Sequence, residues 1–96
     1  MKLIKINGID VSNAISFAYD GCHKIYLCRS KKAETEHTEM GYEILPLNDL
    51  PKVYETSCCL RFINWDNLKN VIEQFENYVE FEFDNEEMII VKFNKE

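Results

Sequence analysis

The stretch VEFEFDNEEMIIVKF, residues 79–93, decides how the C-terminal part of this chain folds. Its first half has the two-residue period of a half-buried strand, with Val79, Phe81 and Phe83 alternating with Glu80 and Glu82. A polar turn over 84–87 follows, and the chain returns through the apolar run 88–93. The stretch therefore predicts a C-terminal β-hairpin with one acidic face.

The preceding stretch, WDNLKNVIEQFENYV over 65–79, predicts a different element. Its apolar residues follow the i, i+3, i+4, i+7 spacing of one helical face, and they are Leu68, Val71, Ile72, Phe75, Tyr78 and Val79. Asp66 is placed to cap the start of such a helix. The pattern predicts an amphipathic helix over about 66–78 that packs against a sheet.

Further strands and helices are predicted upstream. The Asn7-Gly8 dipeptide favours a tight hairpin turn between strands at about 2–6 and 9–11. Residues 23–29 also read as a strand, with Ile25 and Leu27 on one side and Tyr26 and Cys28 on the other.

The middle of the chain alternates helix and strand. A polar helix over 31–40 ends before Gly41, and a strand over 42–47 follows it. Asn48 can then cap a short helix that has Pro51 in its first turn. Together the elements predict one α+β domain over 1–96, with a mixed or antiparallel sheet of four to six strands.

Charge is unevenly distributed along the 96 residues, whose formal net charge is −6. Residues 1–33 hold six basic side chains and two acidic ones, whereas residues 70–91 hold seven acidic side chains and no basic one. These seven are Glu73, Glu76, Glu80, Glu82, Asp84, Glu86 and Glu87. Such a surface repels nucleic-acid phosphates and attracts basic protein surfaces, so we expect these acids to bind a partner.

The cysteines and histidines suggest a structural zinc site. Cys22-His23 follows a predicted turn and Cys58-Cys59 follows a predicted helix, so the two pairs can converge as three sulfurs and one imidazole. Cys28 or His37 could replace one of these ligands. The alternative is that the cysteines pack as small buried side chains, because the usual zinc spacings are absent.

No catalytic motif is recognisable, so we expect a protein without enzymatic activity. The three glycines form no phosphate-binding loop, and no base or orienting acid can be assigned to a cysteine nucleophile. A thiolate enzyme is nevertheless one alternative. Another is a zinc-stabilised regulatory module that contacts nucleic acid through Lys24, Arg29, Lys31 and Lys32.

The absence of a long apolar run or an export signal predicts a cytoplasmic protein. The short acidic chain, with ENYVEFEFDNEE over 76–87, resembles phage-encoded anti-CRISPR inhibitors in its general profile. That resemblance implies a non-enzymatic inhibitor in the cytoplasm of a bacterial host. It also implies that the partner is an RNA-guided nuclease whose loading with nucleic acid is blocked. The resemblance assigns no role to any individual residue.

Overall fold

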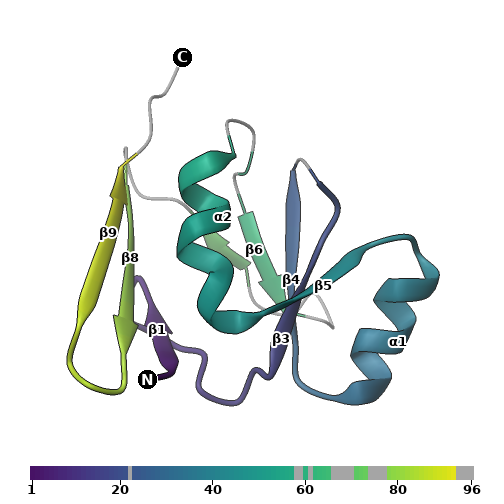
Figure 1. Ribbon diagram of the computed structural model, residues 1–96, viewed down its shortest axis with the longest axis horizontal. Coiled ribbons are helices and arrows are strands. Elements are labelled where there is room, and N and C mark those ends of the chain that lie inside the picture. The colour runs from purple at the N-terminus through teal and green to yellow at the C-terminus, as the bar shows by residue number, and fades with distance from the viewer. Residues whose placement is uncertain (22, 58–59, 61, 66–70, 74–77, 93–96) are drawn as a thin grey trace.

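The C-terminal hairpin belongs to a four-stranded antiparallel sheet with the strand order β2-β1-β8-β9. The computed structural model describes residues 1–21, 23–57, 60, 62–65, 71–73 and 78–92, the side chains of residue 62 and residues 71–73 excepted (Figure 1). The strands of this sheet are β1 (Leu3–Ile6), β2 (Ile9–Asp10), β8 (Tyr78–Phe83) and β9 (Met88–Lys92). The predicted hairpin is confirmed, because β8 pairs antiparallel with β9.

A second sheet has five strands in the order β5-β3-β4-β6-β7. Its strands are β3 (Ser16–Tyr19), β4 (Lys24–Cys28), β5 (Glu43–Pro46), β6 (Phe62–Trp65) and β7 (Val71–Glu73). The sheet is mixed, because β4 and β6 run parallel while the other neighbours are antiparallel. The predicted α+β class is therefore confirmed, with the strands divided between two sheets.

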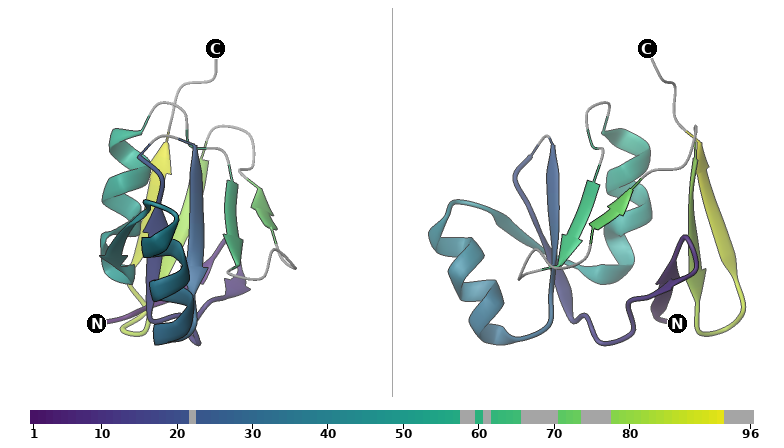
Figure 2. Two further views of the ribbon diagram at one scale, coloured as in Figure 1. Left: turned by 90° about the vertical axis from the view of Figure 1, so that its right-hand side faces the viewer. Right: turned by 180° about the vertical axis from the view of Figure 1, so that it is seen from behind.

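The two helices lie on opposite sides of the five-stranded sheet. Figures 1 and 2 show α1 (Lys31–Glu39) on one side of the five-stranded sheet, and α2 (Leu50–Thr56) between its other side and the four-stranded sheet. A single 3-10 turn, η1 (Leu47–Asp49), leads into α2, which contacts β9. The main apolar core takes residues from both sheets and from α2, among them Leu3, Phe17, Ile25, Tyr54, Ile63 and Phe81.

The predicted side-chain alternation on β4 is confirmed, and in the structure it supplies two cores. Ile25 and Leu27 lie in the main core. Cys28 is buried on the opposite face in a smaller cluster beneath α1, and Tyr26 packs against that cluster. Because successive side chains of a strand point to opposite faces, a central strand covered on both sides must be apolar on both.

Two turns also form for the predicted local reasons. Asn7 and Gly8 have φ angles of 50° and 78°, as the hairpin between β1 and β2 requires. Gly41 has φ of 90° just after α1, where a side chain would be strained.

The amphipathic helix predicted over about 66–78 is wrong in the parts that the structure describes. Val71–Glu73 form β7, and Tyr78 begins β8. Residues 66–70 and 74–77 lie outside the described residues. The helical spacing takes account only of the positions of apolar side chains. In the structure β7 gains backbone hydrogen bonds by pairing with β6, and the β-branched residues Val71 and Ile72 favour a strand.

The predicted helix cap at Asn48 is also wrong. Neither η1 nor α2 has a side-chain cap, although Pro51 does lie in the first turn of α2. The Asn48 side chain instead accepts a hydrogen bond from the Leu3 N–H at 2.9 Å and donates one to the Met1 carbonyl at 2.8 Å. It thus joins the start of the chain to the segment that leads into α2.

Candidate functional site

The outer face of β8 carries two of the predicted partner-binding acids. Val79, Phe81 and Phe83 point into the core, so Glu80 and Glu82 lie on the opposite face of the strand, where both are partly exposed. The sheet thereby fixes the backbone of both glutamates.

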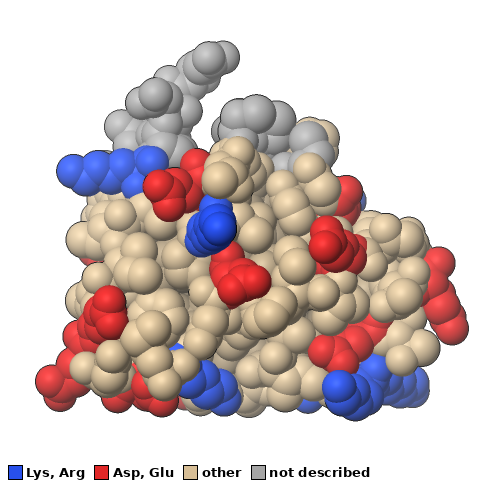
Figure 3. Space-filling model, viewed as in Figure 1, with Lys and Arg blue, Asp and Glu red and all other residues tan. Residues whose placement is uncertain are grey.

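The turn between β8 and β9 carries three more, Asp84, Glu86 and Glu87, all exposed. In Figure 3 acidic side chains gather at the lower left, where Figure 1 places this turn. The Phe83 N–H donates to the Glu87 carbonyl at 2.8 Å, which closes the turn. The Asp84 carboxylate accepts from the Lys2 N–H at 2.9 Å, and the Asp84 N–H donates to the Lys2 carbonyl at 2.8 Å. We call the five residues Glu80, Glu82, Asp84, Glu86 and Glu87 the hairpin acids.

The remaining two predicted acids do not belong to the hairpin. Glu73 ends β7, in the five-stranded sheet, and its side chain is not described. Glu76 lies outside the described residues. The acidic run that appears continuous in sequence is therefore divided between elements, and the hairpin holds five of its seven members.

Asn7 fixes the position of Glu80 from the neighbouring turn. Its backbone N–H donates to the Glu80 carbonyl at 2.9 Å, and its side-chain oxygen accepts from the Glu80 N–H at 2.9 Å. Both backbone groups of Glu80 are thus satisfied by one residue beyond the end of β1. The sequence predicted the turn at Asn7 but not this second use of the side chain.

Apolar side chains that were not predicted as site residues lie beside the hairpin acids. On β9, Met88 and Ile90 are 50% and 52% exposed, and they stand opposite Glu82 and Glu80 in the sheet. Residues 88–91 are all apolar, so only the pairing of β9 with β8 shows which of these side chains face outward. Protein interfaces combine apolar and polar contacts in this manner. With Lys5 paired against Glu82 from β1, the face is acidic without being uniformly so.

No protein-family model, curated protein or solved structure matches this chain. Within the described residues, neither helix is long and apolar enough to cross a membrane.

Three of the four predicted zinc ligands, Cys22, Cys58 and Cys59, lie outside the described residues. The fourth, His23, is exposed, and its backbone N–H donates to the Asp20 carboxylate at 2.8 Å. Among the residues that the structure does describe, no three metal-binding side chains gather.

Cys28 of β4 and His37 of α1, the possible replacement ligands, lie together between the helix and the sheet. The Cys28 sulfur is 3.9 Å from Nδ1 of His37, which is itself 2.8 Å from the Ala33 carbonyl oxygen. A carbonyl oxygen only accepts, so we assign the proton to Nδ1, and this nitrogen cannot take a proton from the thiol. Cys28 lies at the far end of β4 from His23, about 16 Å away at ~3.3 Å per residue. Its position therefore fits packing and fits neither zinc binding with His23 nor nucleophilic chemistry.

The basic residues considered for nucleic-acid binding are partly engaged within the chain. The Arg29 guanidinium lies 5.1 Å from the centre of the Trp65 ring, and the Lys31 ammonium lies 3.4 Å from the Glu34 carboxylate. Lys24 and Lys32 are exposed. These contacts compete with phosphate binding at two of the four positions.

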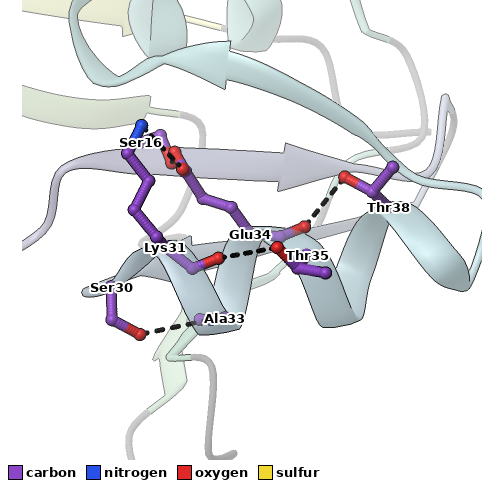
Figure 4. Close-up of polar contacts among 7 residues, drawn as sticks. All are labelled: Ser16, Ser30, Lys31, Ala33, Glu34, Thr35 and Thr38. Atoms are coloured by element: carbon purple, nitrogen blue, oxygen red, sulfur yellow. Dashed lines mark hydrogen bonds and ion pairs between the residues drawn. The ribbon is translucent and has the colours of Figure 1, made fainter.

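A polar contact joins α1 to the five-stranded sheet (Figure 4). The Ser16 hydroxyl of β3 donates to the Glu34 carboxylate at 2.5 Å, and the Ser30 hydroxyl caps α1 by accepting from the Ala33 N–H. Figure 4 also shows the Thr35 and Thr38 hydroxyls bonded to carbonyls one turn earlier. Ser16 is buried and its hydroxyl is committed to Glu34, so this cluster serves to position α1.

Proposed function

We propose that this chain is a non-enzymatic inhibitor that binds a basic protein surface through the hairpin acids. The observation that carries the proposal is the placement of five carboxylates on one β-hairpin whose backbone is held by Asn7 and Lys2. A hairpin backbone that is already held in place loses little conformational freedom on binding, and its carboxylates attract a basic partner over about a Debye length, ~8–10 Å.

The partner that fits this proposal is an RNA-guided nuclease of a CRISPR system. Its nucleic-acid channel is positively charged because it holds phosphates. An acidic hairpin bound there would occupy the place of a nucleic acid and so block its loading. The profile resemblance of residues 76–87 to phage-encoded anti-CRISPR inhibitors supports the same partner.

A charge-neutralising variant tests the proposal. Glu80, Glu82, Glu86 and Glu87 are replaced by Gln in one protein, and the exposed Glu36, Glu39, Glu43 and Glu55 in a control. Each set removes four negative charges, so both take the formal net charge from −6 to −2. Only location then differs between the two proteins.

The readouts are affinity for guide-loaded nucleases and inhibition of their DNA cleavage. The hairpin variant is expected to bind at least about tenfold more weakly, with the control within about threefold, and wild-type affinity should fall as salt is raised. If both variants lost affinity equally, net charge and not the position of the acids would explain binding. Undiminished binding by the hairpin variant would contradict the proposal.

A gel shift separates this proposal from the nucleic-acid alternative. An acidic inhibitor is expected to bind neither DNA nor RNA by itself. A shift that disappears when Lys24, Lys31 and Lys32 are replaced by Gln would instead support a regulatory module that contacts nucleic acid.

We further propose a structural zinc ion held by Cys22, His23, Cys58 and Cys59. What supports it is the parallel register of β4 and β6, in which Lys24 is opposite Phe62. Because His23 precedes Lys24 and Leu60 precedes Phe62, the described residues that flank the cysteines approach one end of the sheet.

Elemental mass spectrometry of the purified chain tests the zinc proposal. One equivalent of zinc is expected, lost in a Cys58→Ser, Cys59→Ser variant together with thermal stability. A Cys28→Ala variant is the control and should keep the metal. Folded wild-type protein without zinc would remove the ion from the proposal.

A further inference from the structure

The edge formed by β9 differs from the other described sheet edges. With five residues it is the longest of them, since β2 has two residues, β7 three and β5 four. Among the four residues of β5 is Pro46, which lacks an N–H group. Short or proline-containing edges resist pairing with another strand, whereas a long apolar edge invites it.

Three residues of β9 have backbone N–H and C=O groups that point away from β8. The Phe83 N–H donates to the Glu87 carbonyl, so this pair is a hydrogen-bonded one. Hydrogen-bonded and non-hydrogen-bonded pairs alternate along an antiparallel ladder. Met88, Ile90 and Lys92 therefore belong to the non-hydrogen-bonded pairs with β8, and their N–H and C=O groups point outward from the edge.

These same three residues have exposed side chains. Met88 and Ile90 are about half exposed on the outer face, and Lys92 is exposed beside them. Within the described part of the chain, the edge thus offers unpaired backbone and uncovered apolar surface at the same positions.

We propose that β9 pairs antiparallel with β9 of a second copy of this chain, about a two-fold axis at Ile90. Ile90 then stands opposite Ile90 of the second copy, and Met88 opposite Lys92. Among the antiparallel registers, only this one sets all three of these residues on one strand opposite the same three residues on the other. It forms on the order of six hydrogen bonds and brings the exposed apolar side chains together.

Charge favours a second copy over an unrelated strand. β9 begins just after Glu86 and Glu87 and ends at Lys92. Antiparallel pairing places the lysine end of each strand beside the acidic turn of the other. The two acidic turns then lie roughly 17 Å or more apart at ~3.4 Å per residue, beyond the Debye length of ~8–10 Å. Parallel pairing would instead set the two turns side by side, where they repel.

The pairing also joins the two outer sheet faces on one side of the dimer. The hairpin acids of both copies would then form one continuous surface. The dimer itself does not depend on the proposed function, since the edge, the register and the charges are independent of any partner.

Sedimentation equilibrium of the full chain, from about 5 to 500 μM, tests the proposal, with a reversible dimer as the expected result. Ile90→Lys places two ammonium groups at the two-fold axis and should leave a monomer. Ile15→Lys is the matched control, because Ile15 is 48% exposed and lies before β3, outside the four-stranded sheet. Circular dichroism checks that both variants fold.

A charge exchange makes the register testable. Lys92→Glu should weaken the dimer at least about tenfold, and adding Glu86→Lys and Glu87→Lys should restore it. A monomeric wild type at every concentration overturns the proposal. So does a dimer that Ile90→Lys leaves intact, or a Lys92→Glu variant that the reciprocal lysines do not rescue.

Discussion

Asn7 and Glu80, 73 positions apart in the chain, are joined by two hydrogen bonds of 2.9 Å, one through the backbone N–H of Asn7 and one through its side-chain oxygen. The pairing between β1 and β8 therefore continues for one residue beyond β1, into the turn that leads to β2. Through this contact the turn holds the backbone of Glu80, one of the hairpin acids.

Replacing Asn7 by Gly is expected to destabilise the chain by about 1–2 kcal/mol, because Gly keeps the positive φ but leaves the Glu80 N–H without its acceptor. Asn7→Asp keeps an acceptor and should lose less. Urea unfolding gives the free energies, and hydrogen exchange of the Glu80 amide gives the local effect. Unchanged protection of that amide in Asn7→Gly would contradict the assigned role.

Replacing Asn48 by Ala is expected to cost about 1–3 kcal/mol, because the N–H of the buried Leu3 loses its acceptor. The exposed Asn13 supplies a control in Asn13→Ala, which should change stability by less than about 0.5 kcal/mol. Thermal and urea unfolding check both. Equal effects in the two variants would mean that the cross-link to the N-terminus contributes nothing specific.

Replacing Ser16 by Ala is expected to lower stability by about 1–3 kcal/mol, because the hydroxyl donates to the partly buried carboxylate of Glu34. Thr35→Ala on the same helix removes an exposed hydroxyl and should have almost no effect. A double-mutant cycle of Ser16→Ala with Glu34→Ala measures the coupling. A coupling energy near zero would show that the two side chains act independently.

Hydrogen bonds from Ser12, first from its hydroxyl and then from its backbone N–H, hold the pKa of Asp10 below its ordinary value of 3.8, with a smaller contribution from Lys5. The charged carboxylate is thus favoured in the folded state. Its contribution to stability is present above pH 3.8 and is lost as the pH falls through the lowered pKa.

Ser12→Ala should therefore raise the pKa of Asp10 towards 3.8, as measured by carboxyl NMR titration. Lys5→Gln should raise it less, because charge attraction is the weaker cause. An Asp10 titration that Ser12→Ala does not alter would rule out the Ser12 hydroxyl as the main cause.

The features predicted correctly from the sequence are local ones. The hairpin turn at Asn7-Gly8, the helix end at Gly41 and the alternation of β4 and β8 depend on residues within a few positions of each other. Backbone sterics and side-chain period act at that range, so the sequence records them directly.

The errors concern residues whose partners belong to another element. Val71–Glu73 have the spacing of a helix and form a strand because β6, the preceding strand, supplies a pairing edge. Asn48 is of a residue type that often caps helices, but its side chain instead binds Leu3 of the N-terminal strand, 45 positions away. For the candidate site, the acids of the hairpin could be found from sequence, but their separation from Glu73 and their apolar neighbours on β9 could not.

The sequence by itself determined the α+β class, the acidic hairpin and the tight turns, because each follows from short-range periodicity, backbone sterics or charge. Only the tertiary structure decided that the strands divide into two sheets, that Asn7 holds Glu80, and that β9 presents an open edge. Those outcomes depend on which backbone groups find partners elsewhere in the fold, and no local pattern encodes that choice.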